Sequence, residues 1–295
     1  MMKTVIPARC LQIFSIELKP GSVMEMYRSE KVSKHITRII DIAGVACYLI
    51  EGNDDACLLD TCCGYGDLKA YVQTLTDKEP FVILTHGHYD HTGSASLFET
   101  VYMSHLDLPV LEEHNRKRSF FLEEDRKVIP SLKNITMADL NPLMRETPMP
   151  LADGDCFDLS GIHLQMISVP GHTQGMMCAL LKEEKTIFLG DACGTGVFLH
   201  EPFSSTASEY EKSLRRLKTF EDQYEHIYRN HGSFISDKDI LDNVLECASL
   251  IAQRRDDHHP VTMYGKTLFE AKRRVSGKRP DGKEGNIVYA AEKAG

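Results

Sequence analysis

Four side chains of metal-binding type crowd into positions 86–91, which read His-Gly-His-Tyr-Asp-His. Imidazole nitrogens and carboxylate oxygens are ligands that suit zinc. Four such groups cannot all face one ion from an extended backbone, so the chain must turn here, as Gly87 permits, and the ligands could serve two adjacent metals. A solvated polar loop is the alternative, but a His-x-His-x-Asp-His run seldom arises by chance. We therefore expect metal ligands at His86, His88, Asp90 and His91.

Three more residues of ligand type stand just beyond expected strands. His172 follows the alternating run 162–169 and lies within a Pro-Gly-His-Thr-Gln-Gly sequence, whose pattern is typical of a strand that ends in a turn. Asp191 and His231 each follow a short apolar run as well. A histidine flanked by glycines at a strand end is poorly placed for a core and well placed to reach a site.

The elements before the motif place a further carboxylate near it. The runs 45–50 and 56–60 predict a hairpin whose second strand ends at Asp60. A helix over 68–75 and a buried strand over 81–84 then complete a parallel crossover. Asp60 thus ends the strand nearest the motif, either as an ordinary turn or cap residue or as a carboxylate that orients a ligand histidine.

The rest of the pattern predicts a strand over 12–18, a helix that begins with a capping box at Thr206 and a helix over 236–255. From about 105 to 147 the sequence becomes charged and dotted with leucines, which indicates a helical insertion. Its apolar residues form either a face packed on the main body or a lid over the site. The pattern of the tail predicts a solvated helix face and a turn. Anion binding is the alternative, and it would use the basic residues Lys266, Lys272, Arg273, Arg274, Lys278 and Arg279.

Composition limits the partners that this chain can have. Its 295 residues carry a net charge of -9 with a pI near 5.8, which argues against general nucleic-acid binding. No stretch reaches the apolar length of a membrane span, and the nine cysteines are odd in number and scattered, as free thiols in a reducing compartment would be. We expect a cytoplasmic protein with a small-molecule substrate and neither nucleic acid nor membrane as partner, and with a homodimer as an option.

The order and surroundings of these motifs resemble the metallo-β-lactamase fold superfamily. In that family an aspartate at a strand end precedes His-x-His-x-Asp-His, a lone His, an Asp and a final His. The resemblance runs from Asp60 to His231. It implies an α/β fold, the four-layered αβ/βα sandwich of two mixed sheets flanked by helices. It also implies one domain over 1–295, with the helical insertion at 105–147 and a helical, basic C-terminal tail at 237–295.

The resemblance further implies which metal each ligand binds. One ion would be held by His86, His88 and His172, the other by Asp90, His91 and His231, and Asp191 would bridge them. Two zinc ions per chain suit these ligands, and iron or manganese would be tolerated. Water bound between two cations is acidic enough to supply hydroxide at neutral pH.

The Pro-Gly-His-Thr-Gln-Gly motif is similar to that of the glyoxalase II and lactonase branch. We therefore expect a dinuclear zinc hydrolase that uses a metal-bridging hydroxide to cleave a small ester, thioester or lactone, with Asp90 or Asp191 orienting the hydroxide or moving its proton. The alternatives are a phosphodiesterase on the same site, a mononuclear iron oxidoreductase resembling persulfide dioxygenases, and a metal-binding module without turnover. Cys193, two residues after Asp191, is either a packed thiol or one that lines the site.

Overall fold

The computed structural model describes residues 26–263 and 265–295, so the strand expected over 12–18 lies outside the described residues. The chain divides into two compact units. We call the described residues up to Leu164 the N-terminal unit and those from Gln165 onward the C-terminal unit. Within the described ranges, none of the helices has the length and apolar character needed to cross a membrane.

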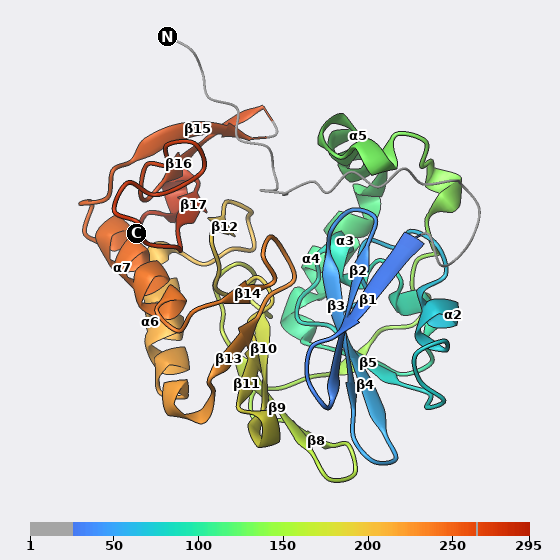
Figure 1. The fold of residues 1–295 in the computed structure, drawn as a ribbon. Helices are drawn as coiled ribbons and strands as arrows, with labels where there is room; N and C mark the ends of the chain where they lie inside the picture. Colours follow the sequence, from blue (N-terminus) through green and yellow to red (C-terminus); the bar gives the residue numbers. More distant parts are fainter. Residues whose placement is uncertain (1–25, 264) are drawn as a thin grey trace. The chain divides into compact units, whose positions relative to one another are not determined.

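A seven-stranded mixed sheet runs through the N-terminal unit in the order β1-β2-β3-β4-β5-β6-β7 (Figure 1). The first four strands pair antiparallel and the later pairs are parallel. The predicted hairpin is β3 with β4, and the predicted crossover joins β4 to β5. The strands are β1 (Tyr27–Lys31), β2 (Ile36–Asp41), β3 (Ala46–Glu51), β4 (Ala56–Leu59), β5 (Phe81–Ile83), β6 (Val101–Met103) and β7 (Met149–Pro150).

Helices and short turns fill the connections of this sheet. The crossover helix stops at Val72, earlier than the expected residue 75, and the Asp67 side chain caps its start by accepting a hydrogen bond from the Ala70 amide. The segment 105–147 is largely helical, and its residues Val110 and Phe121 are buried within the unit. The helices are α2 (Leu68–Val72), α3 (Tyr89–Thr92), α4 (Leu108–Arg116) and α5 (Arg118–Val128), and the 3-10 turns are η1 (Ala95–Leu97), η2 (His105–Asp107), η3 (Pro130–Leu132) and η4 (Met137–Asp139).

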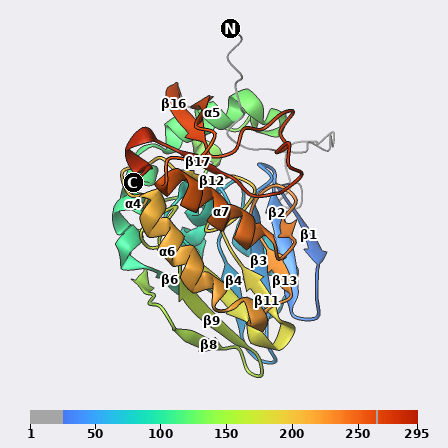
Figure 2. The same cartoon turned by 90° about the vertical axis from the view of Figure 1, so that its left-hand side faces the viewer.

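A six-stranded sheet, most of whose strands belong to the C-terminal unit, has the order β14-β13-β11-β10-β9-β8, and the division between the units falls within β9. Helices α6 and α7 lie side by side (Figures 1 and 2), and their apolar faces join the core that this sheet buries. The capping box predicted at Thr206 is present, with Glu209 as its partner. These elements are β8 (Cys156–Asp158), β9 (His163–Ser168), β10 (Met177–Leu181), η5 (Lys182–Glu184), β11 (Thr186–Phe188), α6 (Ala207–Lys218), η6 (Glu221–Gln223), β13 (His226–Tyr228), β14 (Ile235–Ser236) and α7 (Ile240–Ala252).

The tail after α7 forms strands, so the expectation of a helical face there was wrong. These strands belong to a four-stranded sheet of order β12-β17-β16-β15, built from β12 (Val197–Leu199), β15 (His259–Met263), β16 (Lys266–Glu270) and β17 (Ile287–Tyr289), and η7 (Ala291–Lys293) follows it. Val261, Leu268 and Val288 are buried in this sheet. Only every second residue of such strands faces the core, so β15 and β16 show short apolar patterns, and most of the basic residues that suggested a helix lie after β16, in the connection to β17.

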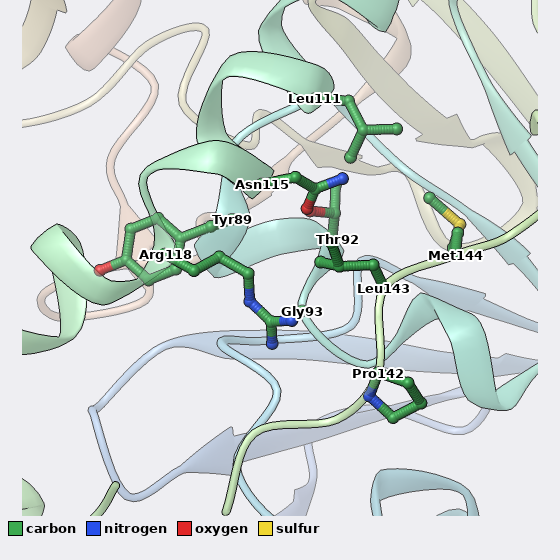
Figure 3. Close-up of a pocket in the computed structure, with 9 residues that line it drawn as sticks. All are labelled: Tyr89, Thr92, Gly93, Leu111, Asn115, Arg118, Pro142, Leu143 and Met144. Carbon is green, nitrogen blue, oxygen red and sulfur yellow. The ribbon is translucent and has the colours of Figure 1, made fainter. Parts of the chain in front are cut away.

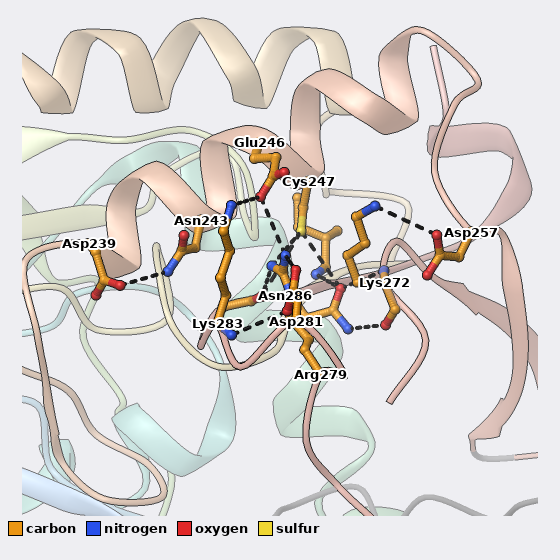
Figure 4. A network of polar contacts seen from close by, with 12 residues as sticks. Asp239, Asn243, Glu246, Cys247, Asp257, Lys272, Arg279, Asp281, Lys283 and Asn286 are labelled. Atoms are coloured by element: carbon orange, nitrogen blue, oxygen red, sulfur yellow. Dashed lines mark hydrogen bonds and ion pairs between the residues drawn. The ribbon is translucent and has the colours of Figure 1, made fainter. Parts of the chain in front are cut away.

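Several basic residues of the tail form ion pairs with acidic residues of the same unit (Figure 4). Arg279 is buried and contacts Asp281 and Glu246, while Lys272 lies 3.6 Å from Asp257. The guanidinium of Arg279 also donates to the Gly285 carbonyl at 2.8 Å. The Arg279–Glu246 pair ties the tail to α7, and the other contacts lie within the tail, so packing within the chain explains much of its basic character.

Candidate metal centre

The predicted ligands fall into two groups, one in each unit. The N-terminal cluster is His86, His88, Asp90 and His91, and the C-terminal cluster is His172, Asp191 and His231. Every member lies at or just beyond the end of a strand, as the sequence predicted: after β5, β9, β11 and β13. Each unit thus gathers its own share of the expected ligands.

The N-terminal cluster is formed where β5 ends and the chain turns into α3. All four of its side chains are buried. The turn passes close to α4, because the Gly87 amide donates to the Asp107 carboxylate at 2.9 Å. A Cβ on Gly87 would lie 2.8 Å from the Asp107 carbonyl oxygen and 2.9 Å from the Leu111 amide, so only glycine fits this approach.

The turn brings the ring nitrogens of this cluster together. The ring centroids of His86 lie 4.6 Å from those of His88 and 4.1 Å from those of His91. Possible ligand atoms of His86 lie within 4.8 Å of those of His88 and also of His91. The Asp90 Oδ2 atom lies 3.8 Å from the His91 Nε2 atom, too far for a hydrogen bond.

Asp60 holds two of these histidines in position. Its Oδ2 atom accepts a hydrogen bond from His91 Nδ1 at 2.9 Å, and its carboxylate also accepts from the Thr85 amide and hydroxyl. The Thr85 Oγ1 atom lies 3.0 Å from His86 Nδ1. Since both Nδ1 atoms are engaged in this way, the Nε2 atoms of His86 and His91 keep the lone pairs that a metal needs.

His114 is a residue of this region that the sequence reasoning missed. It lies on α4, is buried, and stacks on His88 with ring centroids 4.1 Å apart. Its Nδ1 atom accepts a hydrogen bond from the Tyr89 amide at 3.3 Å. Its spacing in the sequence could have indicated that it is buried, because His114 falls on the same helical face as Val110 and Leu111.

The C-terminal cluster is centred on Asp191. Its two carboxylate oxygens face different histidines, with Oδ2 lying 3.7 Å from His172 Nε2 and Oδ1 lying 3.4 Å from His231 Nε2. The His172 Nδ1 atom is 2.8 Å from the Phe198 carbonyl oxygen and donates to it, so its Nε2 atom also keeps a lone pair. One carboxylate therefore lies between two imidazoles, as a bridging ligand would.

Helix α6 supports two of the loops that carry this cluster. The ring of Tyr210 packs against Gly171, where an added Cβ would lie 2.2 Å from the ring, and its hydroxyl donates to the Ala192 carbonyl. The Ser204 hydroxyl donates to the His172 carbonyl at 2.8 Å. The backbone just before His172 and just after Asp191 is thereby tied to one buried aromatic side chain, and the His172 carbonyl is tied to Ser204.

These donor sets fit metal ions within each unit. Two ligand atoms that each lie about 2.1 Å from one tetrahedral zinc are about 3.4 Å apart. The carboxylate-to-imidazole distances of 3.4, 3.7 and 3.8 Å are close to that spacing. Neutral imidazoles held by a second protein group are typical of metal ligands.

Cys193 does not offer a reactive group. It is buried and takes part in the core of the C-terminal unit. Burial raises the pKa of its thiol to about 12, so the thiolate is scarce at neutral pH. Of the two interpretations, the packed thiol fits the structure.

Comparisons with known proteins agree with the motifs. The model of the metallo-beta-lactamase superfamily matches residues 41–224. The chain is 25% identical over 183 residues to human acyl-coenzyme A thioesterase MBLAC2, which covers 58% of this chain and 66% of that protein. It is 24% identical over 230 residues to an atrochrysone carboxyl ACP thioesterase from Aspergillus fumigatus, covering 72% and 61%. The chain thus spans less than two thirds of either curated relative.

Among solved structures, a metallo-beta-lactamase from Pontibacter korlensis aligns with a TM-score of 0.56 at 15% identity, over 76% of this chain and 99% of that one. This likeness concerns the fold. The expected mixed α/β architecture is confirmed, and it is consistent with the αβ/βα sandwich.

Proposed function

Because the chain belongs to the metallo-beta-lactamase superfamily, we propose that it is a metal-dependent hydrolase that cleaves thioesters. The observation that carries the proposal is the arrangement of Asp191, whose two carboxylate oxygens each face the Nε2 atom of a different histidine, His172 or His231. A carboxylate in this arrangement is suited to a shared anionic ligand.

We assign the metals as the motif order indicates. His86, His88 and His172 would hold one ion, Asp90, His91 and His231 the other, and Asp191 both. Two zinc ions per chain suit this set, while iron and manganese are compatible with it. When bound, such ions supply acidified water and a Lewis acid for the substrate's carbonyl oxygen.

The residues of the chain have separate tasks in this proposal. Asp60 and Thr85 keep His86 and His91 in the tautomer that presents Nε2. Asp90 and Asp191 are the carboxylates available to orient the attacking water and to accept its proton. The oxygen of the attacking water forms a bond to the thioester carbonyl carbon and the carbon–sulfur bond breaks. The acyl group is released as a carboxylate, and the sulfur takes up a proton and leaves as a thiol.

The substrate class rests on the relatives. The human and the fungal proteins that match this chain are both named as thioesterases, one for acyl-coenzyme A and one for an acyl carrier protein. We therefore place thioesters before oxygen esters and lactones. The thiol-bearing group of the substrate would be released as the free thiol.

The experiment compares substrate classes on the zinc-loaded full chain. An acyl-coenzyme A, a lactone, a phosphodiester and a β-lactam are offered to the wild type and to His88→Ala and Asp191→Ala. Thioester hydrolysis should be followed by the absorbance of the thioester itself. A reagent that detects the released thiol is unsuitable, because Cys156 of the protein is exposed and would react with it. We expect the acyl-coenzyme A to be cleaved fastest and both variants to lose more than about a hundredfold, beyond the loss typical of a residue that only orients a ligand.

A matched control is His226→Ala, which removes an exposed histidine on β13 and should leave the rate unchanged. Full activity in His88→Ala or Asp191→Ala would overturn the proposal. Oxygen uptake that depends on a persulfide and on bound iron would favour the oxidoreductase alternative. Metal binding without turnover of any of these substrates would favour the non-catalytic module.

We also propose a cytoplasmic setting with a small-molecule substrate and no nucleic-acid partner. Eight cysteines in the described part of the chain are free, and seven of them are buried. Free thiols are the normal state of cysteine in a reducing compartment. The net charge of -9 disfavours binding to a polyanion.

A further inference from the structure

The helical insertion at 105–147 packs closely against the motif that carries the first four predicted ligands. Its helix α4 lies against α3. Beside Tyr89 of α3 the two helices leave a cavity of only about 10 Å³, lined in part by Leu111 and Asn115 of α4 (Figure 3). Such a space holds about one water molecule, so the insertion can orient side chains of the motif by direct contact.

Two buried carboxylates of the insertion hold the residues on either side of His88. The Asp107 carboxylate accepts a hydrogen bond from the Gly87 amide at 2.9 Å. The Asp125 carboxylate accepts one from the Tyr89 hydroxyl. Asp107 is fully buried and Asp125 is 2% exposed, so both bonds are shielded from water. The neighbours of His88 in the chain are thereby fixed on both sides.

A ring of the insertion lies directly on the His88 imidazole. His114 stacks on His88 with ring centroids 4.1 Å apart and an angle of 13° between the ring planes. Phe121 of α5 stacks on His114 in turn, with ring centroids 4.7 Å apart. All three side chains are buried. The His88 imidazole is therefore one member of a buried stack of rings, and the other two members come from the insertion.

His114 is of ligand type itself, but its geometry excludes binding one ion together with His88. The lone pair of an imidazole lies in the ring plane, and zinc binds about 2.1 Å from the nitrogen. Two nearly parallel rings stacked face to face cannot both have one ion in their planes at that distance. The Tyr89 amide donates to His114 Nδ1 at 3.3 Å, so the neutral ring carries its proton on Nε2. We therefore expect His114 to act on a bound metal through His88.

The orientation of the His88 ring decides how well its lone pair reaches a metal. Rotation about the last side-chain torsion of histidine is weakly restricted, so a neighbouring group must fix the ring plane. A hydrogen bond to Asp60 provides that restraint for His91. The Thr85 hydroxyl provides it for His86. Ring stacking is a third way to provide it.

We propose that His114 is the positioning residue for His88, and that its ring fixes the plane of the His88 imidazole for the ion that this ligand binds. The inference rests on the proposed function, which assigns His88 to one of two ions. Because the stack restrains a ligand of one ion, loss of the His114 ring should weaken the binding of that ion selectively.

The experiment measures zinc binding by the full chain, through competition with a chromophoric chelator. His114→Asn removes the ring but keeps a side-chain oxygen that can accept from the Tyr89 amide. His114→Phe keeps a ring for the stack but has no acceptor. His105→Asn is the matched control, because His105 is an exposed histidine of the same insertion. Absorption by the cobalt-loaded proteins is a second readout, since it depends on the coordination geometry.

We expect the wild type to bind two zinc ions. His114→Asn should bind one of them at least about tenfold more weakly, the loss typical of a group that orients a ligand, and the other ion unchanged. His114→Phe should stay within about threefold of the wild type for both ions and keep its cobalt spectrum, because the stack is retained. His105→Asn should match the wild type. General destabilisation would not confine the loss to one ion.

Phe121→Leu keeps the inference testable if His114→Asn does not fold. This conservative change removes the ring that stacks on His114, and it should weaken the same ion by a smaller factor. Wild-type affinity for both ions in these variants, an equal loss for both ions, or a loss in His114→Phe as large as in His114→Asn would overturn the inference. Zinc affinity judges this inference and thioester hydrolysis judges the proposed function, so the two failures are distinguishable.

Discussion

At the residue scale, the arrangement of the ligands depends on a carboxylate that is not itself a predicted ligand. Asp60 receives hydrogen bonds from His91 and from Thr85, which in turn contacts His86. Its backbone has a φ of 64°, in the left-handed region that aspartate and asparagine tolerate better than most residues. Asp60 therefore combines a strained turn with the support of two imidazoles.

Replacing Asp60 by Asn tests this role without disturbing the turn. Asn accepts the left-handed backbone but carries no charge, so it holds the His91 imidazole less firmly. We expect zinc affinity to fall by about 10- to 100-fold. Competition with a chromophoric chelator measures that affinity. Asp54→Asn, in an exposed turn of the same unit, is the control, and equal affinities for the two variants would contradict the prediction.

At this scale the sequence predicted where the candidate ligands lie along the strands, but it was less informative about the groups that support them. The hexameric motif and the strand-end positions of His172, Asp191 and His231 are properties of local sequence. Whether Asp60 would cap a turn or orient a histidine depended on contacts between segments about 30 residues apart, such as the bond to His91. The position of His114 beside His88 depends on the path of α4, which no sequence motif predicts.

At the element scale, helix α6 is the support of the C-terminal cluster. Tyr210 packs on Gly171 and donates to the Ala192 carbonyl, so the helix fixes the loops before His172 and after Asp191. The capping box at Thr206 starts the helix at a defined residue and therefore sets where Tyr210 faces. Sequence alone predicted the cap and the apolar face of this helix, but not which loop Tyr210 would contact.

Gly171→Ala should destabilise the C-terminal unit. The new Cβ would lie 2.2 Å from the buried Tyr210 ring, so the ring or the loop must move. Overpacking of this kind costs about 1–3 kcal/mol of unfolding free energy. Chemical denaturation measures the change. Gly196→Ala is the control, because its Cβ would meet only the flexible Arg274 side chain at 3.5 Å, and an equal loss in both variants would show that the Tyr210 contact is unimportant.

At the scale of the whole molecule, each unit has its own sheets and its own share of the ligands. The alternation of strands and helices before His231 was predictable, because the core strands are short, apolar and bounded by turn residues. The tail was not. Its charged residues suggested a solvated face, whereas Arg279 is buried and paired with acids on α7 and in its own loop.

Arg279→Met tests the contribution of that tail to stability. Arg279 bonds to Asp281, Glu246 and the Gly285 carbonyl, so its loss should cost about 1–3 kcal/mol in unfolding free energy. Arg279 also lowers the pKa of the Asp281 carboxyl below its ordinary value of 3.8. The part of the stability due to this pair is therefore present above that value and lost as pH falls through the folded-state pKa.

Denaturation at pH 7 and at pH 3 should accordingly show a smaller difference between the wild type and Arg279→Met at pH 3. Arg273→Met is the matched control, since Arg273 is an exposed basic residue of the same tail. If Arg273→Met costs as much as Arg279→Met, or if the cost grows in acid, the network in Figure 4 does not fasten the tail as we infer.

The most direct test of the central claim is a zinc titration of metal-stripped protein, with the rate of acyl-coenzyme A hydrolysis measured at each addition. We predict no measurable rate without metal and a rate that saturates as about two zinc ions bind per chain. A full rate in the stripped protein, or no rate after zinc has bound, would contradict the claim that these clusters form a catalytic metal centre.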